Sequence, residues 1–374
     1  MNCIFISPNY PAGHWHYCAA LRAAGYNVIG IGDAGYESFP YELRGNLNDY
    51  VRVSDLHNYD EIYRACASLI GKWGRAERIE CLNPYWNSTV EALRCEFKGC
   101  ECDAQANYSE RTAARFAAPY LPKYAAGLSA KKAAAFGEEN GYPLLAAAAK
   151  DKRLGVHLVE NEAALKKLVS SGGKDAYIIA AQYSGEPVSV DGLICDGALL
   201  ALTAHLQVEK GIYYSLPVTQ ELSDMAEQCA AAAVGSGFFH IDAVRLARAV
   251  KGLGKKGDIV FNGITDTPAH EYIIDCINGQ YGCDIREKWA SVCCGEDDGQ
   301  LQAQCCTAVA VRSFERSYKN AHEKILRRLN IKLLHHGRTA ESDRGEFGDY
   351  VYIFRGEDQA ELRRNIKFIT EDFN

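Results

Sequence analysis

Two short apolar segments with one helical stretch between them constrain how this chain can begin to fold. Residues 3–6 form the first segment and residues 27–31 form the second. Between them, the residues from about His14 to Ala24 are typical of a helix that stops at Gly25. Two strands joined by a single helix pair in parallel, because a parallel pair needs a long crossover connection. The chain is therefore predicted to open with an α/β domain built on a parallel sheet.

The size and charge of the chain narrow the class of protein further. Its 374 residues are enough for two or three domains, each with its own core. The formal net charge of −7 argues against a nucleic-acid-binding surface, which usually carries a basic field. No apolar run approaches the roughly 20 residues of a membrane helix, and the first residues do not resemble a signal peptide. We therefore expect a cytoplasmic protein with no nucleic-acid partner and no membrane partner.

The fifteen cysteines are predicted to be reduced thiols that fill small apolar spaces. Their number is odd, no CxxC motif occurs, and no export signal accompanies them. Two pairs of adjacent cysteines do not suggest a metal site, because neighbours on a strand point to opposite faces.

Four of the histidines are predicted to have no ligand role. His14 and His16 lie two positions apart, so they do not share one face of a helix, and we expect both at the surface. His335 and His336 are expected to be solvated at the end of a strand.

A ligand position is predicted directly after the last strand of the first domain. A helix over about 59–73 leads to a strand over 78–81, which is followed by Asn83 and Trp86. Open α/β folds bind ligands at the carboxyl edge of the parallel sheet. Asn83 and Trp86 are therefore candidate pocket residues, and the alternative for Trp86 is packing at a domain interface.

The later part of the chain has a different pattern of predicted strands and helices. Segments 187–195 and 198–207 alternate well enough to form a hairpin across Asp196 and Gly197. Two apolar strands are predicted near 238–242 and 258–261. The tail is predicted to contain a strand, a helix over 317–328, a second strand, a hairpin-like segment over 350–354 and a final helix.

Several segments in this order resemble the ATP-grasp superfamily, and within it the bacterial carboxylate–amine ligases that carry a Rossmann-like domain before the grasp. They are 5–8 with the helix near His14, 30–33, the Asn-x-Tyr-Trp stretch 83–86, Gly185–Gly192, 239–242 with 254–260, and a tail from Cys306 to Tyr352. The resemblance covers nearly the whole chain. It implies an α/β protein that is α+β in the grasp part. The implied parts are a Rossmann-like domain over 1–105, the two ATP-grasp subdomains over 106–185 and 186–300, and a C-terminal α/β extension over 301–374.

The resemblance also implies a chemistry that needs ATP and Mg²⁺. ATP-grasp ligases activate a carboxylate as an acyl phosphate, which an amine then displaces, and two magnesium ions held by acidic side chains support the phosphoryl transfer. Asp242 matches the first acidic metal ligand. Aligned on Pro268, however, the glutamate, asparagine and arginine of the next strand become Gly263, Thr265 and Thr267. A slip in register offers Asn262 or Asp266, but a one-residue slip turns a side chain to the other face of the sheet.

The nucleotide motifs depart from the family in the same way. The strand lysine that contacts phosphate falls at Ala147, and the acidic hinge that receives the adenine amino group falls at Ala180. The groups left to bind a nucleotide are Lys150, Lys152 and Gln182.

These departures favour a pseudoenzyme that keeps the ATP-grasp fold without ordinary catalysis. Such a protein would be the partner of an active ATP-grasp enzyme or a sensor of a small ligand. The first alternative is an active ligase that uses Asp242 on the metal and Lys150 or Lys152 on phosphate. The second is an unrelated activity in the same cleft, through Cys81 or His240. Assembly into a homo-oligomer stays open.

Overall fold

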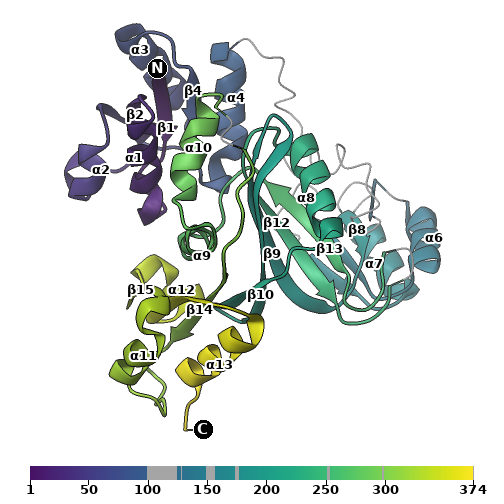
Figure 1. Cartoon of the computed structure of the whole chain (residues 1–374). Coiled ribbons are helices and arrows are strands. Elements are labelled where there is room, and N and C mark those ends of the chain that lie inside the picture. The colour runs from purple at the N-terminus through teal and green to yellow at the C-terminus, as the bar shows by residue number, and fades with distance from the viewer. Residues whose placement is uncertain are drawn as a thin grey trace. The chain divides into compact units, whose positions relative to one another are not determined.

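The computed structural model describes residues 1–98, 124–127, 129–148, 156–172, 177–250, 253–296 and 299–373 (Figure 1). The chain divides into two compact units. The first comprises Met1–Phe116, Ser189–Ile241 and Ile264–Asn374, and the second comprises Ala117–Val188 and Asp242–Gly263.

A four-stranded parallel sheet begins the first unit, with the strand order β3-β2-β1-β4. Its strands are β1 Asn2–Ile6, β2 Asn27–Gly32, β3 Asp49–Arg52 and β4 Arg78–Glu80. β1 pairs in parallel with β2 and with β4, and β2 pairs in parallel with β3. Its helices are α1 Trp15–Ala23, α2 Tyr41–Gly45, α3 Tyr59–Trp73 and α4 Asn87–Lys98. The parallel sheet predicted for the start of the chain is confirmed.

The two faces of this sheet are buried in different cores, as the alternation of side chains along a strand requires. On β1, Ile4 and Ile6 belong to the core that includes residues of α3 and α4. Phe5 belongs instead to the core formed with α1 and with α10 Ile285–Cys293, a helix from much later in the chain. Figure 1 shows α10 beside α1. Tyr26, which follows α1, also contacts α10, because its hydroxyl donates a hydrogen bond of 2.7 Å to the carbonyl oxygen of Cys293.

An eight-stranded sheet has the order β13-β12-β9-β10-β11-β14-β16-β15. Its strands are β9 Gly185–Cys195, β10 Ala198–Glu209, β11 Ile212–Leu216, β12 Gly237–Leu246, β13 Ile259–Thr265, β14 Cys306–Arg312, β15 Leu333–Arg338 and β16 Tyr350–Gly356. The last strands, β11, β14, β16 and β15, pair antiparallel in that sequence. Residues of β9, β12 and β13 are found in both units.

Backbone geometry explains why glycine occupies two positions of the β9–β10 hairpin, one in the turn and one in β9. The turn residues Asp196 and Gly197 have φ values of +47° and +82°, and turns with two positive φ values suit a two-residue hairpin. The hairpin predicted across these residues is confirmed. At Gly192 a Cβ atom would lie 2.3 Å from the carbonyl oxygen of Ala201 and 2.5 Å from the ring of Phe239, so no larger residue fits there.

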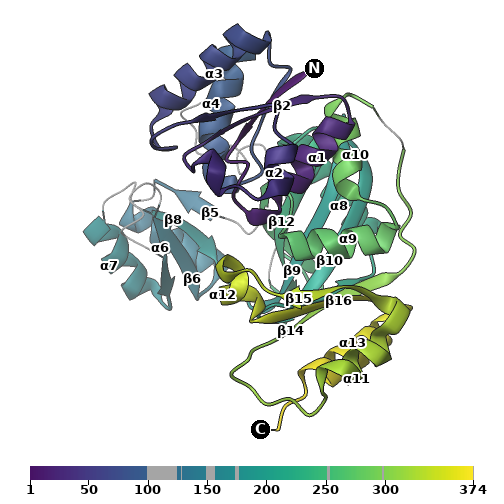
Figure 2. The same ribbon diagram turned by 90° about the vertical axis from the view of Figure 1, so that its left-hand side faces the viewer.

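The remaining helices are α8 Gln220–Ala233, α9 Glu271–Tyr281, α10, α11 His322–Leu329, α12 Arg344–Phe347 and α13 Gln359–Thr370. Figure 2 shows α11 and α13 side by side. The helix predicted from 317 begins at His322 instead. Tyr318 forms a β-bridge with Asp372, and Lys319 donates its backbone N–H to the carbonyl oxygen of Glu371. Pairing with the C-terminal segment therefore replaces the first turns of the predicted helix.

The second unit contains a smaller sheet with the order β5-β8-β6-β7. Its strands are β5 Tyr124–Ala126, β6 Leu144–Ala148, β7 Val156–Val159 and β8 Tyr177–Ala181, and all three neighbouring pairs run antiparallel. Helices α6 Ala130–Asn140 and α7 Glu162–Gly172 share its core. The alanine-bearing segment 109–118, which the sequence predicts to be helical, lies outside the described residues.

Two sequence predictions about side chains need correction. His14 is only 2% exposed, and its ring makes edge contacts with Phe5 and Tyr17, so the prediction that it lies at the surface is wrong. Twelve cysteines of the described ranges are free thiols, as predicted, but Cys95 is disulfide-bonded. The expectation of reduced thiols throughout therefore fails at Cys95. Within the part of the chain that the structure describes, no helix is long and apolar enough to cross a membrane.

Candidate functional site

Asp242, the matched metal ligand, lies in the middle of β12 and is exposed. The alternation of a strand places it on the same face of β12 as His240, two residues earlier. His240 is held by the neighbouring strand β9, because its Nδ1 atom lies 2.6 Å from Oδ1 of Asp191. An ionised carboxylate only accepts hydrogen bonds, so Nδ1 carries the hydrogen and Nε2 is the nitrogen left for other contacts.

Asp191 is a buried carboxylate that several side chains approach. It is 1% exposed, and the hydroxyl of Ser189 donates to its second oxygen. His205, on β10, is fully buried, and neither of its ring nitrogens has a hydrogen-bond partner. Burial lowers the pKa of His205 to about 4, and the charge of Asp191 opposes this shift only in part. Asp191 is therefore paired with His240, while His205 stays neutral near pH 7.

On β13, the positions matched to the second set of metal ligands hold no carboxylate. Gly263 has no side chain, and a Cβ atom built there would meet no atom within 4 Å. The hydroxyl of Thr267, which is buried, donates to the hydroxyl of Thr265 at 3.1 Å. These two threonines therefore bond to each other, in the places where the resemblance expects an asparagine and an arginine.

The two register alternatives do not restore the ligand set. Asn262 is exposed but lies on the opposite face of β13 from Gly263. Asp266 follows the strand and accepts a hydrogen bond of 2.7 Å from Nδ2 of Asn87. Burial raises the pKa of Asp266, so its environment disfavours the charged form that a cation needs.

These residues do not fit a pair of magnesium ions. Magnesium is held by oxygen ligands, chiefly carboxylates, in a strict octahedral geometry. Among the described residues, no group of three or more His, Cys, Asp or Glu side chains is arranged to hold a metal ion.

The positions matched to the nucleotide site lie on the sheet of the second unit. Ala147 on β6 pairs with Ile178 on β8, and Leu145 pairs with Ala180. Gln182 comes directly after β8, and its backbone N–H donates to the carbonyl oxygen of Pro143 at 3.2 Å. Its side chain is half-buried. Lys150 and Lys152 lie outside the described residues.

The structure places Asn83 and Trp86 in a short aromatic cluster at the end of β4. Oδ1 of Asn83 accepts a hydrogen bond from the backbone N–H of Tyr85, so its side chain caps the turn that follows. Trp86 is half-buried against the core next to α3 and makes edge contacts with His57 and Tyr85. His57 is bonded on both sides, to Asp55 and to the hydroxyl of Tyr85. In this cluster Trp86 therefore packs against the core, while Tyr85 is exposed to solvent.

Asp191 and His205 were not predicted from the sequence as site residues, and His240 was named only for an unrelated activity. A signal was present in the apolar strands, where a charged or imidazole side chain stands between buried aliphatic residues. Only the pairing of the three strands brings His240 and His205 near the same carboxylate, that of Asp191.

Solved structures match nearly the whole chain. The crystal structure of L-amino acid ligase from Bacillus licheniformis matches with a TM-score of 0.69 and 9% identity, over 98% of this chain and 96% of that one. Phosphoribosylglycinamide synthetase from Anaerococcus prevotii gives 0.70 and 10%, over 98% and 97%. N5-carboxyaminoimidazole synthetase from Staphylococcus aureus gives 0.64 and 12%, over 98% and 96%. The chain has the ATP-grasp fold.

The ATP-grasp fold confirms the resemblance drawn from the sequence, including the α/β class with a Rossmann-like start. No family model and no curated protein sequence matches the chain. The fold is therefore preserved at identities of 9 to 12% to these three structures.

Proposed function

We propose that this ATP-grasp protein is a pseudoenzyme derived from a carboxylate–amine ligase, which acts as a partner of an active ATP-grasp enzyme or as a sensor of a small ligand. One observation carries the proposal. On and after β13, Gly263 offers no ligand atom, and the hydroxyl groups of Thr265 and Thr267 are bonded to each other. Phosphoryl transfer depends on positive charge around the transferred group, and removing one such contribution typically costs orders of magnitude in rate.

The nucleotide side supports the same proposal. ATP and Mg²⁺ are the cofactors that the fold suggests, and the synthetase from S. aureus also matches in its complex with ADP. In this chain, Ala147 and Ala180 replace the lysine and the acid that the family uses for phosphate and adenine. With Asp242 as one carboxylate ligand, a magnesium ion would depend almost wholly on nucleotide and water oxygens.

The second candidate is an active ligase with displaced residues, and the Asp191–His240 pair favours it. A buried carboxylate stabilises the protonated form of a neighbouring imidazole. His240 precedes Asp242 by two residues on one face of β12, so a positive charge on it would replace part of the missing charge. In this candidate Asp242 would still bind the metal.

We expect the purified full chain to show no magnesium-dependent ATP hydrolysis above background, with the proteinogenic amino acids supplied both as acids and as amines. Its melting temperature should not rise when Mg²⁺ is added to millimolar ATP. A ligand present at about 100 times its dissociation constant would stabilise the chain by about 2.7 kcal/mol, so binding would be visible.

Asp242→Asn is the control variant, because Asp242 is exposed and the change preserves its size. Hydrolysis in the wild type that disappears in D242N would overturn the pseudoenzyme proposal and support the displaced-residue ligase. Hydrolysis that is equal in both proteins would point to a contaminating ATPase and leave the melting experiment to decide.

A further inference from the structure

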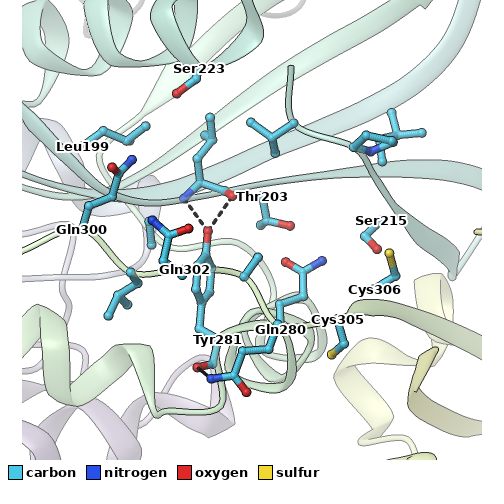
Figure 3. Close-up of a pocket in the computed structure, with 18 residues that line it drawn as sticks. Leu199, Thr203, Ser215, Ser223, Gln280, Tyr281, Gln300, Gln302, Cys305 and Cys306 are labelled. Atoms are coloured by element: carbon cyan, nitrogen blue, oxygen red, sulfur yellow. Dashed lines mark hydrogen bonds between the residues drawn. The ribbon is translucent and has the colours of Figure 1, made fainter. Parts of the chain in front are cut away.

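A cavity of about 460 Å³ lies in the first unit. Its walls come from β10 and β11, from Ser223 of α8, from the end of α9, and from residues 300–306, which lead into β14 (Figure 3). Its lining includes neither Asp242 nor Gly263 nor Gln182. The volume falls within the range of small-molecule sites, which is about 300 to 1,000 Å³.

The chemistry of the lining is uncharged. Among its eighteen residues there is no Asp, Glu, Lys, Arg or His. Four glutamines and four hydroxyl side chains provide hydrogen-bond donors and acceptors, and aliphatic side chains such as Leu199 and Val218 provide the apolar surface. Among the described residues of this lining, a phosphate or carboxylate would find no cation, and an amine would find no carboxylate. A buried charge without a partner is strongly disfavoured.

One buried polar group in this lining has no hydrogen-bond partner within the protein. Thr203 is 1% exposed, and its Oγ1 atom makes no hydrogen bond. Most buried hydroxyls in proteins are hydrogen-bonded, because leaving one unpaired costs free energy. Gln280, only 5% exposed, lines the same space. In Figure 3, Thr203, Gln280 and Gln302 gather around this space.

The walls of the cavity are held in place by specific bonds. The hydroxyl of Tyr281 accepts a hydrogen bond from the backbone N–H of Leu202 and donates one to its carbonyl oxygen, at 2.9 and 2.7 Å. The 300–306 segment is fastened at both ends. Leu301 donates its N–H to the carbonyl oxygen of Leu200, and Gln304 donates to that of Gln280, each at 2.7 Å. A preformed wall lowers the entropy cost of binding.

We propose that this cavity binds an uncharged small molecule that carries several hydroxyl or amide groups, such as a neutral sugar or a nucleoside. Glutamine amides both donate and accept, which suits groups that do the same. The hydroxyl of Thr203 gains its missing partner from the ligand, while the aliphatic side chains cover the carbon skeleton. The site is independent of the ATP-grasp residues.

The test uses the full chain with four probes, namely N-acetylglucosamine, uridine and the monophosphate of each. Calorimetric titration should detect binding of at least one neutral probe, and its monophosphate should bind at least about tenfold more weakly, because the phosphate finds no cation. Binding of N-acetylglucosamine identifies a sugar as the source of this chemistry, and binding of uridine identifies a nucleoside. No binding of either neutral probe, or equal binding of the phosphate, would overturn the proposal.

Thr203→Val separates the pocket from other binding sites. Valine has the shape of threonine, and losing an unpaired buried hydroxyl should not destabilise the fold. The variant should weaken binding about two- to tenfold, the value of one hydrogen bond. Thr307→Val is the matched control, because Thr307 is equally buried and lies outside the lining. D242N should bind as the wild type does, so failure here is distinct from failure of the proposed function. Equal affinity of T203V and T307V would contradict the assignment.

Discussion

Replacing Arg286 with methionine is expected to lower the free energy of unfolding by about 3 to 5 kcal/mol. Arg286, on α10, is 4% exposed and lies among three carboxylates. Its Nη2 atom is 2.7 Å from Glu271 and 3.2 Å from Asp275, and its Nη1 atom is 3.2 Å from Asp284. Methionine fills similar space but carries no charge. The substitution therefore leaves three acidic groups without the cation that compensates their partial burial.

The measurement is urea unfolding of the full chain at neutral pH, followed by far-UV circular dichroism. Arg245→Met is the matched control, because Arg245 pairs with Glu186 in a more exposed setting, with side-chain exposures of 27% and 57%. Exposed pairs contribute about 0 to 1 kcal/mol, so R245M should change stability little. Similar losses in both variants would show that the burial of Arg286 does not decide the effect.

Features set by local chemistry were predictable from the sequence. The parallel start follows from two apolar segments and one helix within a short stretch, and β1, β2 and α1 lie where these segments are. The hairpin follows from Asp196 and Gly197, two residues that tolerate positive φ. The resemblance extended these local predictions to the whole fold, because its motifs lie on strands whose order the fold conserves.

Features that depend on the register between strands were not predictable. Asp191 and His240 are 49 residues apart in sequence, and neither one indicates the other. His205 lies close enough to feel the charge of the same carboxylate only because β10 pairs beside β9. His14 was misplaced for a related reason, since its contacts with Phe5 and Tyr17 join β1 to α1. A helical pattern in the sequence predicts which residues share one face of a helix, but it does not predict which other elements pack against that face.

The departures at the candidate site were visible in the sequence, and the structure adds their consequence. Aligning on Pro268 predicts Gly263, Thr265 and Thr267 in the ligand positions. The structure adds the bond between the two threonines and the open space at Gly263. The roles of Lys150, Lys152 and Gln182 remain predictions.

Acid is expected to destabilise this protein well above the pH at which ordinary carboxylates titrate. His14 and His205 are 2% and 0% exposed, and burial lowers the pKa of each from 6.5 to about 4. Between these values, the unfolded chain binds protons that the folded chain does not. Stability is therefore fully present above pH 6.5 and falls as the pH drops toward 4. At 1.36 kcal/mol per unit, each histidine accounts for a loss of up to about 3 kcal/mol.

The variant His205→Leu isolates one of these contributions. His205 makes no hydrogen bond through either nitrogen, so leucine should fit the apolar strand without leaving a broken bond. Urea unfolding should be measured at pH 7.5, 6.0 and 5.0. The part of the pH-dependent loss in free energy of unfolding that comes from His14 and His205 should be about half as large in H205L as in the wild type. Comparing both proteins at each pH cancels the titration of shared carboxylates, with Asp191 as the one group to check, since it lies close to His205. An unchanged pH dependence in H205L would mean that His205 gains a proton in the folded chain as easily as in the unfolded one. In that case Asp191 would stabilise the charged imidazole as much as burial disfavours it, and the carboxylate would act on two histidines rather than one.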